Sequence, residues 1–114
     1  MAEQLVPIFR ANDAAATATW YARLGFQLES EHRFAPNMPL YAFLKRGDVC
    51  LHLSVHKGDA TPNSLAYLYV DDIDAIGKEF DMEVKDQPWG TREVCLEDPD
   101  GNRLRIGQRV ASSQ

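Results

Sequence analysis

Apolar and polar residues follow one another in several stretches of the chain as expected for β-strands, whose successive side chains point to opposite faces of a sheet. In residues 49–55, four aliphatic side chains share one face, whereas Cys50, His52 and Ser54 share the other. The first face is typical of a protein core, and the second is neither core nor bulk surface by composition. The predicted strands span residues 5–9, 26–34, 40–46, 49–55, 65–70, 91–97 and 103–109.

Two helices are predicted between these strands, because apolar residues recur there every three or four positions. The first helix spans Asp13–Leu24, with Asn12 as its N-cap and Gly25 as the residue that ends it. The second helix is short and begins at Asp71 or Asp72. The apolar stripes comprise Thr17, Trp20, Tyr21 and Leu24 in the first helix and Ile73, Ile76, Gly77 and Phe80 in the second.

The order of a strand, a helix and further strands occurs twice along the chain, which indicates an internal duplication. When the ends of the two halves are aligned, His52 and Arg105 become related positions. The length fits one domain with a single modest core. We therefore predict one domain over residues 1–114, with module 1 at about 1–56 and module 2 at about 64–110.

The composition is that of an ordinary globular protein, with 45% hydrophobic and 25% charged residues. A formal net charge of −5 argues against nucleic acid as a partner, because phosphate binding needs a basic surface. No apolar stretch approaches the roughly 20 residues of a membrane span, and no secretory signal is visible, so we expect a cytoplasmic protein without a membrane partner. Cys50 and Cys95 are expected to be reduced thiols.

The turn Asp98–Asn102 is followed by a strand that carries unexpected charges. Proline presets one backbone dihedral of this turn, and glycine and asparagine tolerate positive φ. The next strand places Arg103 and Arg105 on one face and two aliphatic residues on the other. An arginine in the middle of a strand needs either a cleft to face or a carboxylate on a neighbouring strand to pair with.

Three motifs together resemble the vicinal oxygen chelate superfamily, which includes glyoxalases, extradiol dioxygenases, fosfomycin-resistance enzymes and bleomycin-resistance proteins. They are Trp20–Phe26 at the end of the first helix, the Gly47–Asp48 hairpin and the turn Asp98–Asn102. Within the superfamily, the sequence is most similar to the bleomycin-binding resistance proteins. The segments that carry this likeness are Val6–Ile8, Asn63–Tyr67 and Gln87–Gly90.

The resemblance implies an α+β fold in which two βαβββ modules form a curved mixed sheet. It also implies a homodimer with ligand clefts at the subunit interface, commonly with an exchanged N-terminal strand. Pro7 suits such a dimer arm, because a residue without an N–H interrupts a hydrogen-bonded ladder.

The enzymes of the superfamily hold a metal with His, Gln or Glu side chains at up to four strand positions. By alignment of the motifs, these positions fall here on Val6, His52, Leu65 and Arg105. Aliphatic side chains donate nothing to a divalent cation, and a guanidinium repels one. Because a catalytic metal needs about three protein ligands, we predict no metal, no cofactor and no catalytic residue. No nucleophile motif or glycine-rich phosphate loop indicates another kind of catalysis.

Counting along the strands from His52 and Arg105 assigns further side chains to the same inward faces. Trp89 lies in a Pro-Trp-Gly loop of the short, irregular segment 82–90, where its indole is free to cap a cleft. Stacking and cation–π contacts with such aromatic groups favour flat or cationic ligands. The predicted ligand-binding residues are Phe34, Tyr41, His52, Ser54, Tyr67, Tyr69, Trp89, Glu93 and Arg105.

Several of these residues also have a purely structural interpretation. Tyr67 and Tyr69 could serve only to pack the sheet, and Trp89 could cap the core. Arg105 could pair with Glu93 across neighbouring antiparallel strands rather than contact a ligand.

We predict a non-catalytic protein that binds and sequesters a planar or cationic small molecule, with a bleomycin-family antibiotic as the leading candidate. Arg105 opposes a cationic drug unless Glu93 neutralises it. Two alternatives stay open. A metal-dependent lyase or isomerase of the glyoxalase kind predicts stoichiometric divalent metal, and a metabolite-sensing binding module predicts thermal stabilisation by another ligand.

Overall fold

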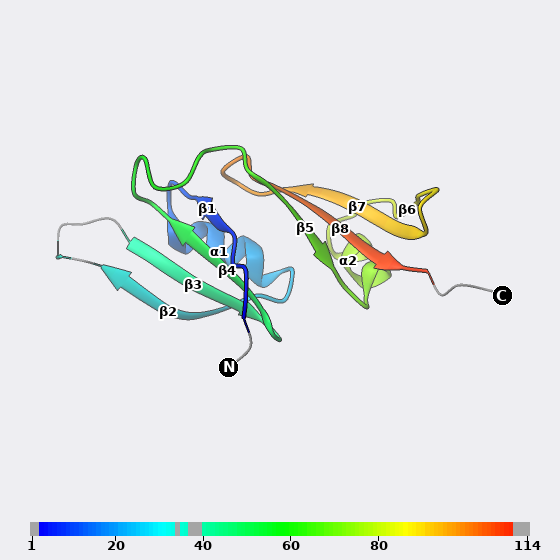
Figure 1. The fold of residues 1–114 in the computed structure, drawn as a ribbon, viewed down its shortest axis with the longest axis horizontal. Coiled ribbons are helices and arrows are strands. Elements are labelled where there is room, and N and C mark those ends of the chain that lie inside the picture. The colour runs from blue at the N-terminus through cyan, green and yellow to red at the C-terminus, as the bar shows by residue number, and fades with distance from the viewer. Residues whose placement is uncertain (1–2, 34, 37–39, 111–114) are drawn as a thin grey trace. The chain divides into compact units, whose positions relative to one another are not determined.

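The computed structural model describes residues 3–33, 35–36 and 40–110, which form two units with one four-stranded sheet each (Figure 1). Unit 1 comprises Met1–Ser64 and Asp98–Asn102, and unit 2 comprises Leu65–Glu97 and Arg103–Gln114. The elements of unit 1 are β1 (Ile8–Arg10), α1 (Ala14–Ala22), β2 (Gln27–Arg33), β3 (Leu40–Arg46) and β4 (Val49–Ser54). Those of unit 2 are β5 (Leu65–Tyr69), α2 (Ile73–Glu79), β6 (Lys85–Asp86), β7 (Thr91–Glu97) and β8 (Arg103–Arg109).

The sheet of unit 1 has the strand order β1-β4-β3-β2, with β1 parallel to β4 and the other neighbours antiparallel. Leu51 and Leu53 of β4 are buried, as the alternation of that strand predicts, and they lie opposite Leu44 and Ala42 of β3. The helix α1 contacts β2 and β3. The alternation leaves His52 on the opposite, half-buried face of the sheet.

Unit 2 repeats this arrangement with the strand order β5-β8-β7-β6, in which β5 is parallel to β8. The helix α2 contacts β7 and β8. The core of unit 2 includes the buried side chains of Leu68, Ile73, Ile76, Val94, Leu96, Leu104 and Ile106. The matching strand orders confirm the predicted α+β class with two βαβββ modules. Neither helix in the described part of the chain is long and apolar enough to cross a bilayer.

The ends of the first helix differ from the sequence-based prediction. Asp13, not Asn12, is the N-cap, because its carboxylate accepts hydrogen bonds from two backbone N–H groups of the first turn at 3.1 and 3.2 Å. The helix ends at Ala22 rather than at Leu24. Gly25 then adopts a φ of +91°, as expected for a glycine that follows a helix.

Three strands also differ from the prediction. Strand β1 spans Ile8–Arg10 rather than residues 5–9. Strand β2 is exposed at every position, and its pairing with β3 shifts register between Leu28 and Ser30, so its alternation marks no buried face. The segment 82–90 is not wholly irregular, because Lys85 and Asp86 pair with β7 as strand β6. Such a short strand carries too little alternation to be predicted from sequence.

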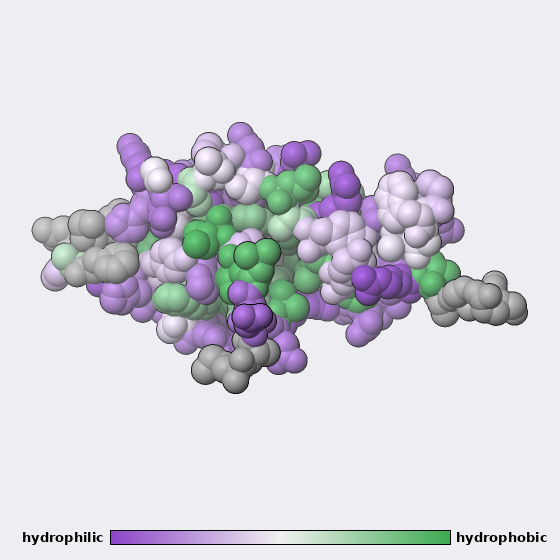
Figure 2. All heavy atoms as spheres, viewed as in Figure 1, coloured by the Kyte–Doolittle hydropathy of each residue, from purple (hydrophilic) through white to green (hydrophobic). Residues whose placement is uncertain are grey.

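Unit 1 exposes several apolar side chains in β1, in the segment before it and in β4. Leu5, Ile8 and Val49 are exposed, and Figure 2 shows hydrophobic surface gathered over β1 and β4. In the same region, the carbonyl oxygen of Pro7 accepts a hydrogen bond from the backbone N–H of His52 at 3.1 Å. Contiguous exposed apolar surface is typical of protein interfaces. The homodimer and its exchanged arm stay predictions.

The turn Asp98–Asn102 is held in unit 1 by its own side chains. Asp98 is only 5% exposed and accepts a hydrogen bond from the hydroxyl of Tyr21 at 2.7 Å. Asn102 is fully buried, and its side-chain amide donates to the carbonyl oxygen of Arg10 at 2.8 Å. The turn therefore fastens α1 and the end of β1, which is a structural role.

Tyr21 gives a prediction about stability at high pH. The side chain is fully buried, and burial, the hydrogen bond to Asp98 and the charges of Asp98 and Asp100 raise the pKa of Tyr21 well above its ordinary value. In the unfolded chain, tyrosine loses its proton near about pH 10, so ionisation favours the unfolded state above that pH. The free energy of unfolding should therefore fall above about pH 10 by up to ~1.4 kcal/mol per pH unit through this group.

Urea unfolding of the wild type and of Tyr21→Phe between about pH 8 and pH 11 measures this effect. The wild type is expected to be the more stable protein at the lower pH, because phenylalanine leaves Asp98 without its phenol donor. The difference in the free energy of unfolding should shrink as the pH rises. A difference that does not change with pH would contradict the prediction.

Candidate functional site

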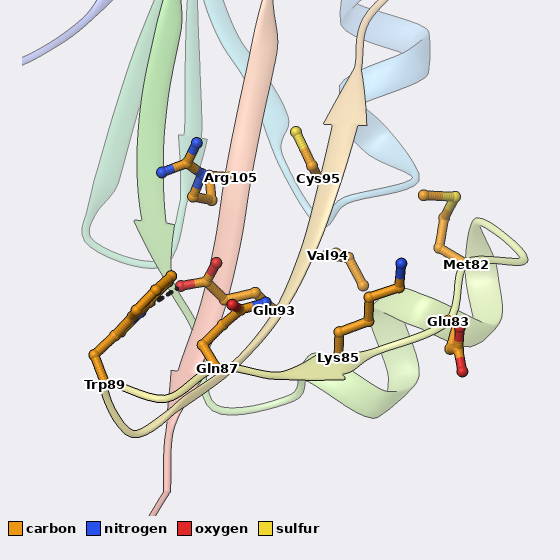
Figure 3. A pocket seen from close by; sticks show the side chains of 9 residues that line it. All are labelled: Met82, Glu83, Lys85, Gln87, Trp89, Glu93, Val94, Cys95 and Arg105. Atoms are coloured by element: carbon orange, nitrogen blue, oxygen red, sulfur yellow. Dashed lines mark hydrogen bonds between the residues drawn. The ribbon is translucent and has the colours of Figure 1, made fainter.

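The middle of β7 carries a carboxylate that is almost fully buried. Glu93 is 6% exposed, and its Oε2 atom accepts three hydrogen bonds. The donors are the hydroxyl of Tyr67 at 2.6 Å, the hydroxyl of Thr91 at 2.8 Å and the indole Nε1–H of Trp89 at 3.1 Å (Figure 3). No residue among those described donates a hydrogen bond to Oε1, so this second oxygen is available to a ligand.

These contacts also determine the charge of the carboxylate. Desolvation raises the pKa of Glu93, but the hydrogen bonds from Tyr67, Thr91 and Trp89 and the positive charge of Arg105 lower it. The net pKa lies below the ordinary value for glutamate. Glu93 is therefore a fixed, oriented anion at neutral pH.

The hydroxyl of Tyr67 reaches Glu93 only because the opposing strand has a glycine. Gly107 of β8 lies directly opposite Glu93 in the antiparallel pairing of β7 and β8. A Cβ at Gly107 would overlap the hydroxyl oxygen of Tyr67 and would lie 3.0 Å from its Cζ and 3.2 Å from the Cγ of Glu93. Because Gly107 has no side chain, the phenol of Tyr67 can lie against the backbone of β8 at this residue.

Trp89 lies in a tight loop between β6 and β7. The loop is closed by hydrogen bonds from the N–H of Gln87 to the carbonyl of Thr91 at 2.8 Å and from the N–H of Gly90 to the carbonyl of Gln87 at 3.1 Å. Gly90 has a φ of +94°, which few other residues adopt. The indole is 64% exposed although its N–H is bound to Glu93, so it does not cap the core.

A hollow of about 380 Å³ lies beside this group of side chains (Figure 3). Glu93, Trp89 and Arg105 contribute to its lining, and Figure 3 shows Trp89 and Glu93 directed toward each other. Arg105 also lines an adjoining hollow of about 230 Å³ with Leu65 and Tyr67. The full lining of the larger hollow is Met82, Glu83, Lys85, Gln87, Trp89, Glu93, Val94, Cys95 and Arg105.

One further aromatic residue of unit 2, Tyr69, lies beside Tyr67. The rings of Tyr67 and Tyr69 have their centroids 4.6 Å apart. The guanidinium of Arg109 lies 4.1 Å from the centroid of the Tyr69 ring, which is a cation–π contact within the protein. Tyr69 is therefore already covered in part by a cation, whereas Trp89 is not held in this way.

A second cluster of predicted site residues lies on the sheet of unit 1. The hydroxyl of Tyr41 and Nδ1 of His52 are 3.0 Å apart, and the ring of Phe43 lies 4.7 Å from the imidazole. Desolvation lowers the pKa of His52, so the imidazole is neutral at neutral pH. Desolvation and the charge of Asp59 raise the pKa of Tyr41. The cluster offers aromatic surface and a neutral hydrogen-bonding group.

The structure thus divides the predicted site residues into two groups. It brings Tyr67, Trp89 and Glu93 into contact, with Arg105 beside them, and it brings Tyr41 and His52 together in unit 1. Ser54 is fully buried, and its hydroxyl donates to the carboxylate of Asp59 at 2.6 Å. Phe34 lies outside the described residues.

Sequence reasoning missed several participants in these groups. Thr91 donates a hydrogen bond to Glu93, Gly107 lies opposite Glu93, and the rings of Phe43 and His52 meet edge-to-face. Counting outward from the turn would have placed Gly107 opposite Glu93, because Glu97 already pairs with Arg103 at the start of β8. The alternation of β3 likewise places Phe43 on the face of Tyr41.

The residues that the resemblance places at the metal-binding positions of the superfamily do not fit a metal. Val6 and His52 occupy them in unit 1, and Leu65 and Arg105 occupy them in unit 2. Within residues 3–33, 35–36 and 40–110, no three His, Cys, Asp or Glu side chains gather in a way that could hold a metal ion. One imidazole falls short of the roughly three protein ligands of a catalytic metal site.

Comparison with known families identifies the class of protein. A model of glyoxalase superfamily proteins matches residues 1–113, so the chain belongs to the glyoxalase superfamily. No curated protein sequence matches it significantly.

Several solved structures are similar to this chain. A bleomycin-binding protein complexed with bleomycin is 27% identical, with a TM-score of 0.73 and coverage of 95% of this chain and 99% of that chain. A bleomycin resistance determinant encoded on the transposon Tn5 is also 27% identical, with a TM-score of 0.75 and coverage of 95% and 98%. A glyoxalase-related enzyme from Clostridium phytofermentans shares the fold at 20% identity, a TM-score of 0.76 and coverage of 96% and 97%. These matches confirm the resemblance stated from the sequence.

Proposed function

We propose that the chain binds a planar or cationic small molecule and holds it without chemical change, with a bleomycin-family antibiotic as the leading candidate. The observation that carries this proposal is the Glu93 carboxylate. Three donors fix it in its ionised form, one oxygen is left open, and the exposed indole of Trp89 lies next to it. A fixed anion among aromatic rings attracts a cationic or flat group through charge, stacking and cation–π contacts. Because the protein has already ordered the carboxylate, little further ordering is needed on binding.

Two observations favour binding over catalysis. The residues that the resemblance places at the metal-binding positions of the superfamily's enzymes are two aliphatic side chains, an arginine and a single histidine, which do not make a ligand set. A structural neighbour with 27% identity over 95% of this chain is a bleomycin-binding protein complexed with that drug. The fold alone could not decide the matter, because this fold also serves an enzyme.

Titration with bleomycin while tryptophan fluorescence is followed tests the proposal. We expect saturable quenching with a dissociation constant at or below about 1 μM, which corresponds to about 8 kcal/mol. Trp89→Phe should abolish most of the signal, whereas Trp20→Phe, which removes the half-buried tryptophan of α1, should leave it. Glu93→Gln keeps an acceptor for the three donors but removes the charge, and it should weaken binding by roughly tenfold or more.

Two results would overturn the proposal in different ways. The absence of saturable quenching at about 50 μM drug would exclude bleomycin as the ligand. Stoichiometric divalent metal in the purified protein, measured by elemental analysis, would contradict the non-catalytic part. Equal affinities of the wild type and Glu93→Gln would show that the carboxylate does not hold the ligand.

A further inference from the structure

The hollow beside β7 is lined by charges of both signs. Lys85 and Arg105 contribute positive charge to its lining, and Glu83 and Glu93 contribute negative charge. Lys85 of β6 lies directly opposite Glu93, and Gly107 of β8 is the opposite partner of Glu93 on its other side. Arg105 lies two residues from that glycine, on the same face of the sheet. Glu93 is therefore flanked by a cation on each neighbouring strand.

Glu93 does not neutralise Arg105 by direct contact. The two side chains are diagonal neighbours rather than opposite ones, since Arg105 pairs in register with Cys95 of β7 and Tyr67 of β5. The charge of Arg105 lowers the pKa of Glu93, yet no ion pair joins the two in the described part of the chain. Arg105 is exposed and lines both hollows. Its side chain is therefore accessible from both hollows.

We propose that Arg105 binds an anionic group of the ligand, such as a carboxylate, a sulfonate or a phosphate. This inference rests on the proposed function, because it concerns the same hollow. Among planar ligands it favours aromatic molecules that carry an acidic group over purely cationic molecules, so it counts against a purely cationic drug as the natural ligand. A ligand with an acidic group is zwitterionic where it also places a cation on Glu93. A guanidinium can donate two parallel hydrogen bonds to two oxygen atoms of such an acidic group.

The same arrangement of charges disfavours ligands that carry only positive charge. A purely cationic molecule gains attraction from Glu93 but meets Arg105 and Lys85 in the same hollow. An aromatic anion gains attraction from both cations and stacks on the exposed ring of Trp89, but it also meets Glu83 and Glu93. A zwitterion can place its negative group beside the cations of the hollow and its positive group beside the carboxylates. Charge complementarity of this kind chiefly determines specificity.

Two fluorescent probes that differ by one sulfonate test the proposal. They are 8-anilinonaphthalene-1-sulfonate and N-phenyl-1-naphthylamine, which share the same aromatic skeleton. We expect the wild type to bind the sulfonate about tenfold more tightly, which corresponds to about 1.4 kcal/mol. Arg105→Gln should remove this preference and leave the affinity for the neutral probe within about twofold.

Arg103→Gln is the matched control. Arg103 lies on the same strand and the same face and is also exposed, but it does not line the hollow. Both substitutions change the net charge equally, so only a site-specific role of Arg105 separates them. Trp89→Ala should weaken the binding of both probes, which places them in this hollow.

Three results would overturn the proposal. They are an equal loss of sulfonate affinity in Arg103→Gln and Arg105→Gln, an unchanged preference in Arg105→Gln, and a sulfonate that does not bind below about 1 mM. These results are separable from the bleomycin titration. The drug can fail to bind while the sulfonate preference persists, and the preference can be absent from a protein that binds the drug.

Discussion

Replacing Asp98 by alanine is expected to lower the free energy of unfolding by about 4 kcal/mol. The buried carboxylate accepts hydrogen bonds from the hydroxyl of Tyr21 at 2.7 Å, the backbone N–H of Asp100 at 2.8 Å and the backbone N–H and side-chain amide of Asn102 at 3.0 and 3.2 Å. Alanine accepts none of them, and each buried donor left without a partner costs about 1–3 kcal/mol. Urea unfolding followed by circular dichroism measures the loss.

An exposed turn residue provides the control for this substitution. Asp48 lies in the hairpin between β3 and β4, and Asp48→Ala should change the free energy of unfolding by less than about 0.5 kcal/mol. Asp98→Asn keeps one acceptor oxygen and should therefore lose less stability than Asp98→Ala. A loss below about 1 kcal/mol for Asp98→Ala would contradict the structural role of the turn.

The same turn shows how a motif can identify a family without contacting a ligand. Its residues predicted a tight turn from local chemistry alone, and Gly101 indeed adopts a φ of +83°. Asp98 accepts hydrogen bonds within the turn, but its carboxylate also accepts one from the hydroxyl of Tyr21, which lies 77 positions earlier. A partner at that distance leaves no local pattern in the sequence.

The local periodicity of the sequence was sufficient to predict most of the fold and to predict which residues share one face of the sheet at the site. The alternation of β4 predicted the burial of Leu51 and Leu53, and the alternation of β7 and β8 placed Glu93 and Arg105 on one face. The prediction of Asn12 as the N-cap of the first helix was wrong, because Asn and Asp are equally good N-caps and the two stand next to each other here. Only the direction of the backbone at Asp13 decides between them.

The geometry around Glu93 could not be predicted because it depends on two independent registers. The turn fixes the pairing of β7 with β8, so Gly107 opposite Glu93 could be counted from the sequence. No turn fixes the parallel pairing of β5 with β8, which places Tyr67 beside Arg105. The convergence of three donors on a single carboxylate oxygen further requires side-chain conformations that no periodicity encodes.

Gly107→Ala is expected to destabilise the protein by about 3 kcal/mol, although alanine is intrinsically the better strand residue. Replacement of glycine by alanine within a regular strand should stabilise by roughly 0.5–1 kcal/mol. Here the new Cβ would overlap the hydroxyl of Tyr67, and overpacking costs about 1–3 kcal/mol. Displacement of the phenol also removes a hydrogen bond to a buried, charged carboxylate, which adds about 1.5–3 kcal/mol.

A double-mutant cycle with Tyr67→Ala isolates this effect. Once the phenol is absent, Gly107→Ala should cost little, and the interaction free energy between the two substitutions should reach about 2 kcal/mol. The pKa of Glu93 should rise in Gly107→Ala, because a hydrogen bond that lowers it is lost. If instead the two substitutions are additive, the close approach of Tyr67 to the backbone does not hold the carboxylate, and the basis for a preorganised anion at this site is lost.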